Sequence, residues 1–166
     1  MQKKIKFEGI VITLLLLFTI QGKANPIDGK SYDNWTVRCE KQGEQESCFI
    51  FQNLVLKEGG SRLLHIAVGY LSAAKKVPVI LISMPLGISL PPGASIRIDD
   101  QDPIKFQIER CERSGCRGGF KLKESMLKSF REGKKATVTF HDGHRKAINV
   151  PLSLAGFSDG LEALKL

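Results

Sequence analysis

The stretch WTVRCEKQGEQESCFIFQ, Trp35 to Gln52, decides how the chain folds. Apolar and polar residues alternate at its start, so Trp35, Val37 and Cys39 share one face of a predicted strand. A second strand pattern begins at Cys48, after the eight-residue polar segment EKQGEQES. Two strands joined by a short polar loop predict an antiparallel hairpin, with a disulfide between Cys39 and Cys48.

Further strand patterns follow at short intervals and are separated by turn-forming residues. They are rich in Val, Ile and Phe, and they cover residues 48–56, 62–70, 77–83, 94–99, 104–111, 117–123, 135–140 and 146–154. This spacing predicts a mainly β protein, built as a single β-sandwich or barrel-like domain of short antiparallel strands.

Two short helices interrupt the strand patterns, at residues 124–132 and 158–165. In the first, ESMLKSFREG, the residues Met126, Leu127 and Phe130 form an apolar stripe, and Gly133 ends the helix. In the second, SDGLEALKL, Leu161 and Leu164 form the stripe. Ser158 or Asp159 is the predicted N-cap of this helix.

A second cysteine pair occurs in CERSGC, Cys111 to Cys116. These thiols could form a redox pair, half of a metal site or a structural disulfide. A thioredoxin-like motif has two residues between its cysteines, whereas four intervene here, and zinc would need two further ligands. The strand patterns on both sides favour a hairpin with a four-residue loop, Glu112 to Gly115, in which Gly115 can adopt positive φ. Although four cysteines allow three pairings, local pairing is therefore expected.

The N-terminus has the pattern of a secretory signal peptide. Lys3, Lys4 and Lys6 precede the apolar run from Ile10 to Ile20, and the small residues of GKA end at Ala24. The run is about half the length of a membrane-spanning helix. We therefore expect cleavage near Ala24, which removes residues 1–24, leaves a single domain at 25–166 and lowers the formal net charge from +8 to +5. The expected location is the periplasm, the outer surface or the medium, where disulfides form readily.

Positive charge is concentrated in the second half of the chain. Residues 110–166 carry 12 basic and 6 acidic groups. The candidate residues for binding an anionic partner are Arg110, Arg113, Arg117, Lys121 and Lys123. Such a partner could be a lipopolysaccharide, a phospholipid headgroup, so that the protein associates peripherally with a membrane, or an acidic host or periplasmic protein. An ordinary solvated surface is the alternative. Nucleic acid is not expected, because few aromatic residues lie among these charges to stack on bases.

Two further motifs could suggest enzymatic chemistry. GFSDG, Gly156 to Gly160, matches the nucleophile elbow of α/β-hydrolases, but no histidine follows it to complete a triad. HDGH, His141 to His144, predicts a hairpin with a two-residue Asp142-Gly143 turn and the two histidines facing each other. A metal-dependent activity would use His141, Asp142 and His144, but no third strong ligand is placed beside them. We therefore assign no catalytic residue, metal or cofactor.

The motifs, taken in order, resemble the invasion-associated locus B family of bacterial envelope proteins. The resemblance rests on NWTVRC with CFIFQ, on MPLGISLPPGASIRIDD, on FQIERCERSGC and on VPLSLAGFSDGLEAL, and it covers roughly residues 33–165. It implies an exported, mostly β protein with disulfides, and the family takes its name from host-cell invasion in one pathogenic lineage. The resemblance supplies no catalytic residues. A non-enzymatic envelope or surface-associated protein that acts by binding, in virulence or host-cell invasion, is therefore expected. The alternatives are a periplasmic chaperone-like or inhibitor domain, or a metal-dependent hydrolase.

Overall fold

The computed structural model describes residues 25–56, 59–71 and 77–165. The predicted signal peptide, residues 1–24, lies outside the described residues. Within the described part, no helix is both long and apolar enough to cross a membrane.

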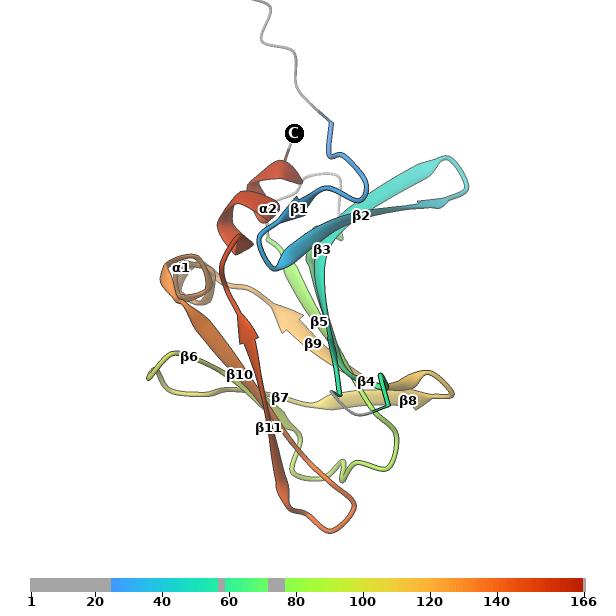
Figure 1. Ribbon diagram of the computed structural model, residues 1–166, viewed down its shortest axis with the longest axis vertical. Coiled ribbons are helices and arrows are strands. Elements are labelled where there is room, and N and C mark those ends of the chain that lie inside the picture. The colour runs from blue at the N-terminus through green and yellow to red at the C-terminus, as the bar shows by residue number, and fades with distance from the viewer. Residues whose placement is uncertain (1–24, 57–58, 72–76, 166) are drawn as a thin grey trace, which may run out of the picture.

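Two antiparallel sheets form the fold, as the strand patterns predicted (Figure 1). The seven-stranded sheet has the order β1-β2-β3-β4-β5-β9-β8. Its strands are β1 (Ser31–Tyr32), β2 (Trp35–Gln42), β3 (Gln45–Val55), β4 (Arg62–Gly69), β5 (Val79–Met84), β9 (Gly115–Lys121) and β8 (Ile108–Glu112). The four-stranded sheet has the order β11-β10-β6-β7. Its strands are β11 (Ala147–Ser153), β10 (Lys135–His141), β6 (Ala94–Ile98) and β7 (Ile104–Phe106).

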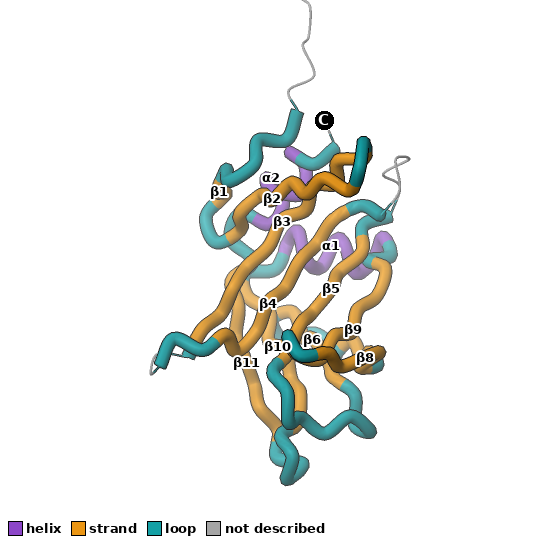
Figure 2. The backbone as a smooth tube through the Cα atoms, turned by 90° about the vertical axis from the view of Figure 1, so that its right-hand side faces the viewer, coloured by secondary structure: helices purple, strands orange, loops and turns teal. Residues whose placement is uncertain are grey.

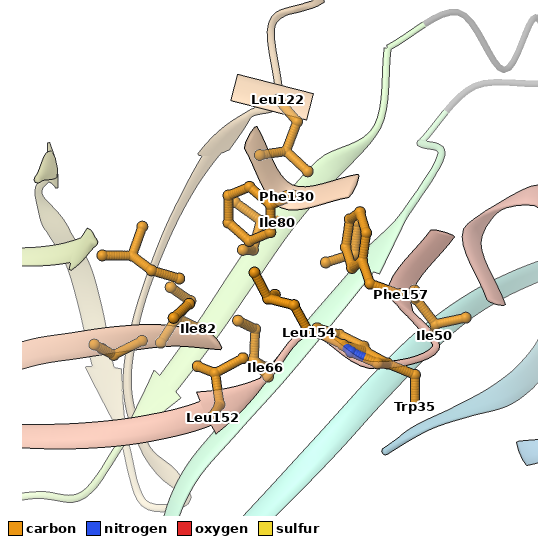
Figure 3. Packing of buried hydrophobic residues seen from close by; sticks show 14 of the residues in the cluster. Trp35, Ile50, Ile66, Ile80, Ile82, Leu122, Phe130, Leu152, Leu154 and Phe157 are labelled. Atoms are coloured by element: carbon orange, nitrogen blue, oxygen red, sulfur yellow. The ribbon is translucent and has the colours of Figure 1, made fainter. Parts of the chain in front are cut away.

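The hydrophobic core lies between the sheets and is closed by α1 (Glu124–Glu132) and α2 (Phe157–Ala163) (Figure 3). Alternation of inward and outward residues along the strands supplies the core side chains. Along β4, Leu64, Ile66 and Val68 are fully buried, whereas the residues between them point away from the core. The predicted helix at 124–132 is confirmed, and its stripe places Leu127 and Phe130 in the core.

Trp35 joins the first hairpin to the end of the chain. Its indole N–H donates a hydrogen bond to the carbonyl of Ser153 at 3.2 Å, and Gln52 Nε2 donates to the same oxygen at 2.6 Å. The indole also meets the ring of Phe157 edge to face, with centroids 5.2 Å apart, and Phe130 stacks beyond it. The buried indole thus has both its apolar surface and its one polar group satisfied.

The second helix begins one residue earlier than predicted. Its N-cap is Gly156, with φ 82°, and not Ser158 or Asp159. Ser158 lies within the first turn, and its hydroxyl donates to the carbonyl of Arg131. The reason is steric, because the chain turns into α2 beside Tyr32, and a Cβ at position 156 would overlap the carbonyl oxygen of that residue. Only glycine fits there, and it also adopts the left-handed conformation at little cost.

Both disulfides form as predicted, Cys39–Cys48 and Cys111–Cys116, but the hairpins are tighter than expected. The predicted eight-residue loop in the first hairpin is wrong, since both strands continue past the cysteines to a turn at residues 43–44. The four-residue loop in CERSGC is also wrong, because Glu112 pairs with Gly115 and leaves residues 113–114 as the turn. Gly115 has positive φ, as predicted. In each hairpin, ladder hydrogen bonds extend further than the cysteines alone suggested.

The predicted strand at 104–111 is divided between the two sheets. β7 pairs with β6 in the four-stranded sheet, and β8 pairs with β9 in the seven-stranded sheet. Gln107 alone separates them, and its carbonyl lies against Gly118 on β9, where a Cβ would overlap it. A single residue therefore carries the chain from one layer to the other.

Removal of each disulfide is expected to cost about 2–3 kcal/mol in the free energy of unfolding, because the crosslink restricts the unfolded chain. The cysteines lie 9 positions apart in the first hairpin and 5 positions apart in the second. Urea unfolding of the paired serine variants C39S/C48S and C111S/C116S would measure both costs. The first pair should cost slightly more, and unchanged midpoints would contradict the expectation.

Candidate functional site

The outward side of the seven-stranded sheet, here called the open face, is left uncovered by the rest of the described fold. Figure 1 shows the sheet nearly edge-on, with the β2–β3 hairpin projecting from its upper part and the β8–β9 hairpin from its lower part. Figure 2 looks onto this face, where β3, β4 and β5 run side by side. Each projecting hairpin carries one disulfide. The open face is therefore concave and bordered by two crosslinked walls.

A groove of about 280 Å³ follows β4 across the open face. Its floor is formed by Gly69 and Ala67, which carry little or no side chain. In the strand register, Gly69 lies between Phe49 and Val79, and Ala67 lies between Phe51 and Leu81. Two small residues between larger apolar neighbours on both sides leave a narrow apolar channel along the strand.

Gly69 has to be a glycine for the groove to keep this shape. A Cβ at this position would lie 2.8 Å from the Cβ of Phe49 and 3.1 Å from the carbonyl oxygen of Cys48. Apolar side chains are also unusually accessible here, with Leu81 46% and Leu71 75% exposed. The solvent side of an antiparallel sheet is normally polar, so this surface departs from the usual alternation.

One end of the groove is polar, because the next row of the sheet holds Asn53, His65, Ser83 and Arg117. His65 Nδ1 lies 2.7 Å from Asn53 Oδ1. An amide oxygen only accepts hydrogen bonds, so Nδ1 carries the proton and Nε2 remains as the second polar atom of the ring. Partial burial, then the positive charges of Arg62 and Arg117, lower the pKa of His65, against a smaller opposing effect from Glu40.

Two arginines from different strands, Arg62 and Arg117, lie at this polar end, and a third lies on an adjoining hollow. Arg62 at the start of β4 donates a hydrogen bond to the carbonyl of Ser114 at 3.3 Å, in the turn of the β8–β9 hairpin. Arg117 lines the groove, and Arg38 on β2 lines an adjoining hollow with Arg62 and His65. Among the described residues, none of these arginines has a carboxylate partner within 4.0 Å. The end of the groove is thus cationic.

The structure separates the five basic residues predicted from the sequence. Arg110 and Arg117 pair across β8 and β9, and Lys121 follows on the same face of β9 opposite Val79. Arg110 is 3.4 Å from the carboxylate of Glu112. Arg113 lies in the exposed turn of the hairpin, and Lys123 lies beyond the sheet as the residue before α1. Only Arg117 of the five lines the groove.

Sequence reasoning missed Arg62 and His65 as residues near Arg117 at the polar end. His65 alternates with buried residues, so its outward orientation could be read from the sequence. Its position beside Ser83 and Arg117 could not, because it depends on the order β4-β5-β9 in the sheet.

The two motifs that could suggest enzymatic chemistry do not form such sites in the described residues. His141 pairs with Ala147, so the predicted two-residue turn with His141 facing His144 is wrong. Asp142 Oδ1 instead accepts hydrogen bonds from the backbone N–H groups of His144 and Lys146, which widens the turn. No cluster of three or more His, Cys, Asp or Glu side chains in the described part of the chain could hold a metal ion. In GFSDG, Ser158 lies inside α2, and its hydroxyl donates a hydrogen bond to the carbonyl of Arg131.

Comparison with known proteins gives consistent matches over nearly the whole described domain. The family model described as invasion associated locus B protein matches residues 35–165. Invasion protein B homologues from Brucella abortus, in strain 2308 and in biovar 1 strain 9-941, are each 24% identical over 164 residues, covering 95% of this chain and 94% of theirs. The crystal structure of invasion associated protein b from Bartonella henselae is similar in fold, with a TM-score of 0.72 and 22% sequence identity. That match covers 81% of this chain and 92% of the other.

Proposed function

The chain belongs to the invasion associated locus B family, and we propose that it is an exported, non-enzymatic envelope protein that binds its partner through the groove on the open face. The relatives from Brucella abortus are named as invasion protein B homologues. That naming supports a role in host-cell invasion. The two disulfides support a location outside the cytoplasm, where oxidising conditions maintain them.

The observation that carries this proposal is the composition of the open face. A sheet face that only meets water gains nothing from leaving Leu81 exposed and Phe49 and Phe51 half-exposed. Contiguous apolar surface rimmed by polar groups is typical of binding sites. Arg62 and Arg117 at one end add attraction for negative charge. A partner that is partly apolar and carries negative charge would complement both parts of the groove.

A retention experiment on isolated envelopes and host-cell membranes tests this function. The mature, oxidised protein would be labelled at its N-terminus and incubated with each membrane preparation, and the retained fraction would be measured. The variant L81D/R117E places negative charge in the groove, so its retention should fall at least about tenfold. The matched control is R97E, which reverses an exposed arginine on β6 in the other sheet.

Retention by the wild type and R97E but not by L81D/R117E would support binding through the groove. Equal retention of all three proteins, or no retention of the wild type by either preparation, would contradict the proposed function. Added salt should lower the retained fraction, because it screens the attraction between the arginines and negative charge on the partner.

A further inference from the structure

We propose that the groove binds a single-chain lipid phosphate, with the alkyl chain along Gly69 and Ala67 and the phosphate at the arginine end. This inference rests on the proposed function and names the chemistry of the ligand. The shape of the groove, the character of its two ends and the hydrogen bonding of the strands beneath it support the inference independently of one another.

The shape of the groove suits one alkyl chain. The channel follows a single strand from Gly69 to His65, which is roughly 13 Å at the rise of a β-strand. Along this strand its walls, Phe49 on one side and Val79 and Leu81 on the other, are carbon surfaces without charged groups. A volume of about 280 Å³ is just below the usual range for small-molecule sites, which suits one chain better than two.

The position of the groove argues against an extended peptide. Peptides that bind sheets gain affinity from backbone hydrogen bonds at an exposed edge. The groove instead lies over the middle of the sheet, where β4 pairs with both β3 and β5 and its backbone groups are used in those ladders. An alkyl chain needs no hydrogen bonds along its length, so it can lie on this surface without leaving any hydrogen-bonding group unpaired.

The cationic end suits a phosphate. Arg117 lines this end of the groove with His65, and Arg62 lines the adjoining hollow that His65 also lines. The hydroxyl of Ser83 lines the same end of the groove. Guanidinium groups bind phosphate oxygens through paired, charge-assisted hydrogen bonds, and a phosphate carries more negative charge than a carboxylate. Glu40 is the one acidic residue among those lining the groove, on the side of the β2–β3 hairpin.

Protonation of His65 should strengthen phosphate binding. The neutral ring offers Nε2 as an acceptor, whereas the protonated ring offers it as a donor with positive charge. The groups that act on this ring are Arg62 and Arg117, which oppose protonation, and Glu40, which favours it. A bound phosphate would offset the arginines, so protonation of His65 should favour binding as the pH falls. The phosphate itself gains a proton at about pH 6, and this opposite effect is the same in any variant of His65.

Isothermal titration calorimetry with the oxidised mature protein tests the inference, using dodecyl phosphate below its micellar concentration as the probe. Three comparison ligands separate the parts: butyl phosphate keeps the headgroup, dodecyl maltoside keeps the chain, and dodecanoate replaces phosphate by carboxylate. Dodecyl phosphate should bind saturably, one molecule per chain. Butyl phosphate and dodecyl maltoside should each bind at least about tenfold more weakly, because each lacks one half of the recognition. The affinity for dodecanoate should lie between the affinities for these two ligands and the affinity for dodecyl phosphate.

Two variants test whether the ligand lies in the groove. A67L fills the floor of the channel and R117A removes one guanidinium, and each should weaken dodecyl phosphate at least about tenfold. R97A, on the other sheet, should bind as the wild type does. H65Q should lose more affinity than the wild type between about pH 7 and about pH 5, because the phosphate is protonated in both cases but only the wild type gains the charge of His65. Thermal unfolding of every variant distinguishes lost binding from lost folding.

Two results would overturn the inference. One is the absence of dodecyl phosphate binding, and the other is binding that A67L and R117A leave unchanged. If membrane retention still depends on Leu81 and Arg117 in that case, the proposed function stands and the partner is an acidic protein surface. If retention is also independent of the groove, both proposals fail.

Discussion

Gly156→Ala is expected to lower the free energy of unfolding by more than about 4 kcal/mol, or to prevent folding altogether. Two effects combine at this residue. Its φ of 82° is strained for any residue with a side chain, and a Cβ would overlap the carbonyl oxygen of Tyr32 in β1. Backbone atoms on both sides fix this approach, because the N–H of Asn34 donates to the carbonyl of Ala155. Relief would require moving α2, which buries Phe157 and Leu161.

Urea unfolding followed by circular dichroism would measure the loss, with Gly29→Ala as the matched control. Gly29 has a similar φ of 79°, but a Cβ there would meet nothing within 4 Å. The control should therefore cost only the conformational strain, about 1 kcal/mol. A loss at Gly156 no larger than that at Gly29 would contradict the close approach to Tyr32.

Trp35→Ala is expected to cost about 3–5 kcal/mol, which makes it the second largest effect. The substitution leaves a large cavity beside Phe157, and it removes the hydrogen bond from the indole to Ser153. Trp35 connects β2 to β11 and α2, so its loss weakens contacts among three elements at once.

Trp35→Phe separates the two contributions, because it keeps an aromatic ring but cannot donate to Ser153. It should cost clearly less than the alanine variant. Trp35 is the single tryptophan of the chain, so the wild-type fluorescence should be blue-shifted in the native state and should report its exposure on unfolding. A cost below about 2 kcal/mol for Trp35→Ala would show that the core repacks around the gap.

Local patterns made most of the fold predictable. Alternation located the strands because one face of each meets the core, and the cysteines paired correctly because each pair lies in one hairpin. The division at Gln107 was not predictable, because Ile104, Phe106 and Ile108 continue one alternation whether the strand stays in its sheet or leaves it. The N-cap at Gly156 also escaped prediction, because the contact with Tyr32 that requires glycine comes from the other end of the chain.

The groove was less predictable than the fold. Arg117 was identified because it lies in a run of basic residues, but His65 had no visible partner in the sequence. Gly69 and Ala67 attract no notice in a strand pattern, although their small size forms the floor. A site on the face of a sheet is assembled from several strands, so the information lies in strand order and register, which hydrophobic patterns leave open.

The single-residue connection at Gln107 also makes the β8–β9 hairpin, which borders the open face, stiffer than the β2–β3 hairpin opposite it. The β8–β9 hairpin is anchored at its base to both layers, because β7 continues directly into β8. A force on its tip is therefore resisted by the four-stranded sheet as well as by β5. The β2–β3 hairpin beyond Cys39 and Cys48 has only its own two strands for support. When a ligand enters the groove, the wall formed by β2 and β3 should bend, while the wall that carries Arg117 keeps its position.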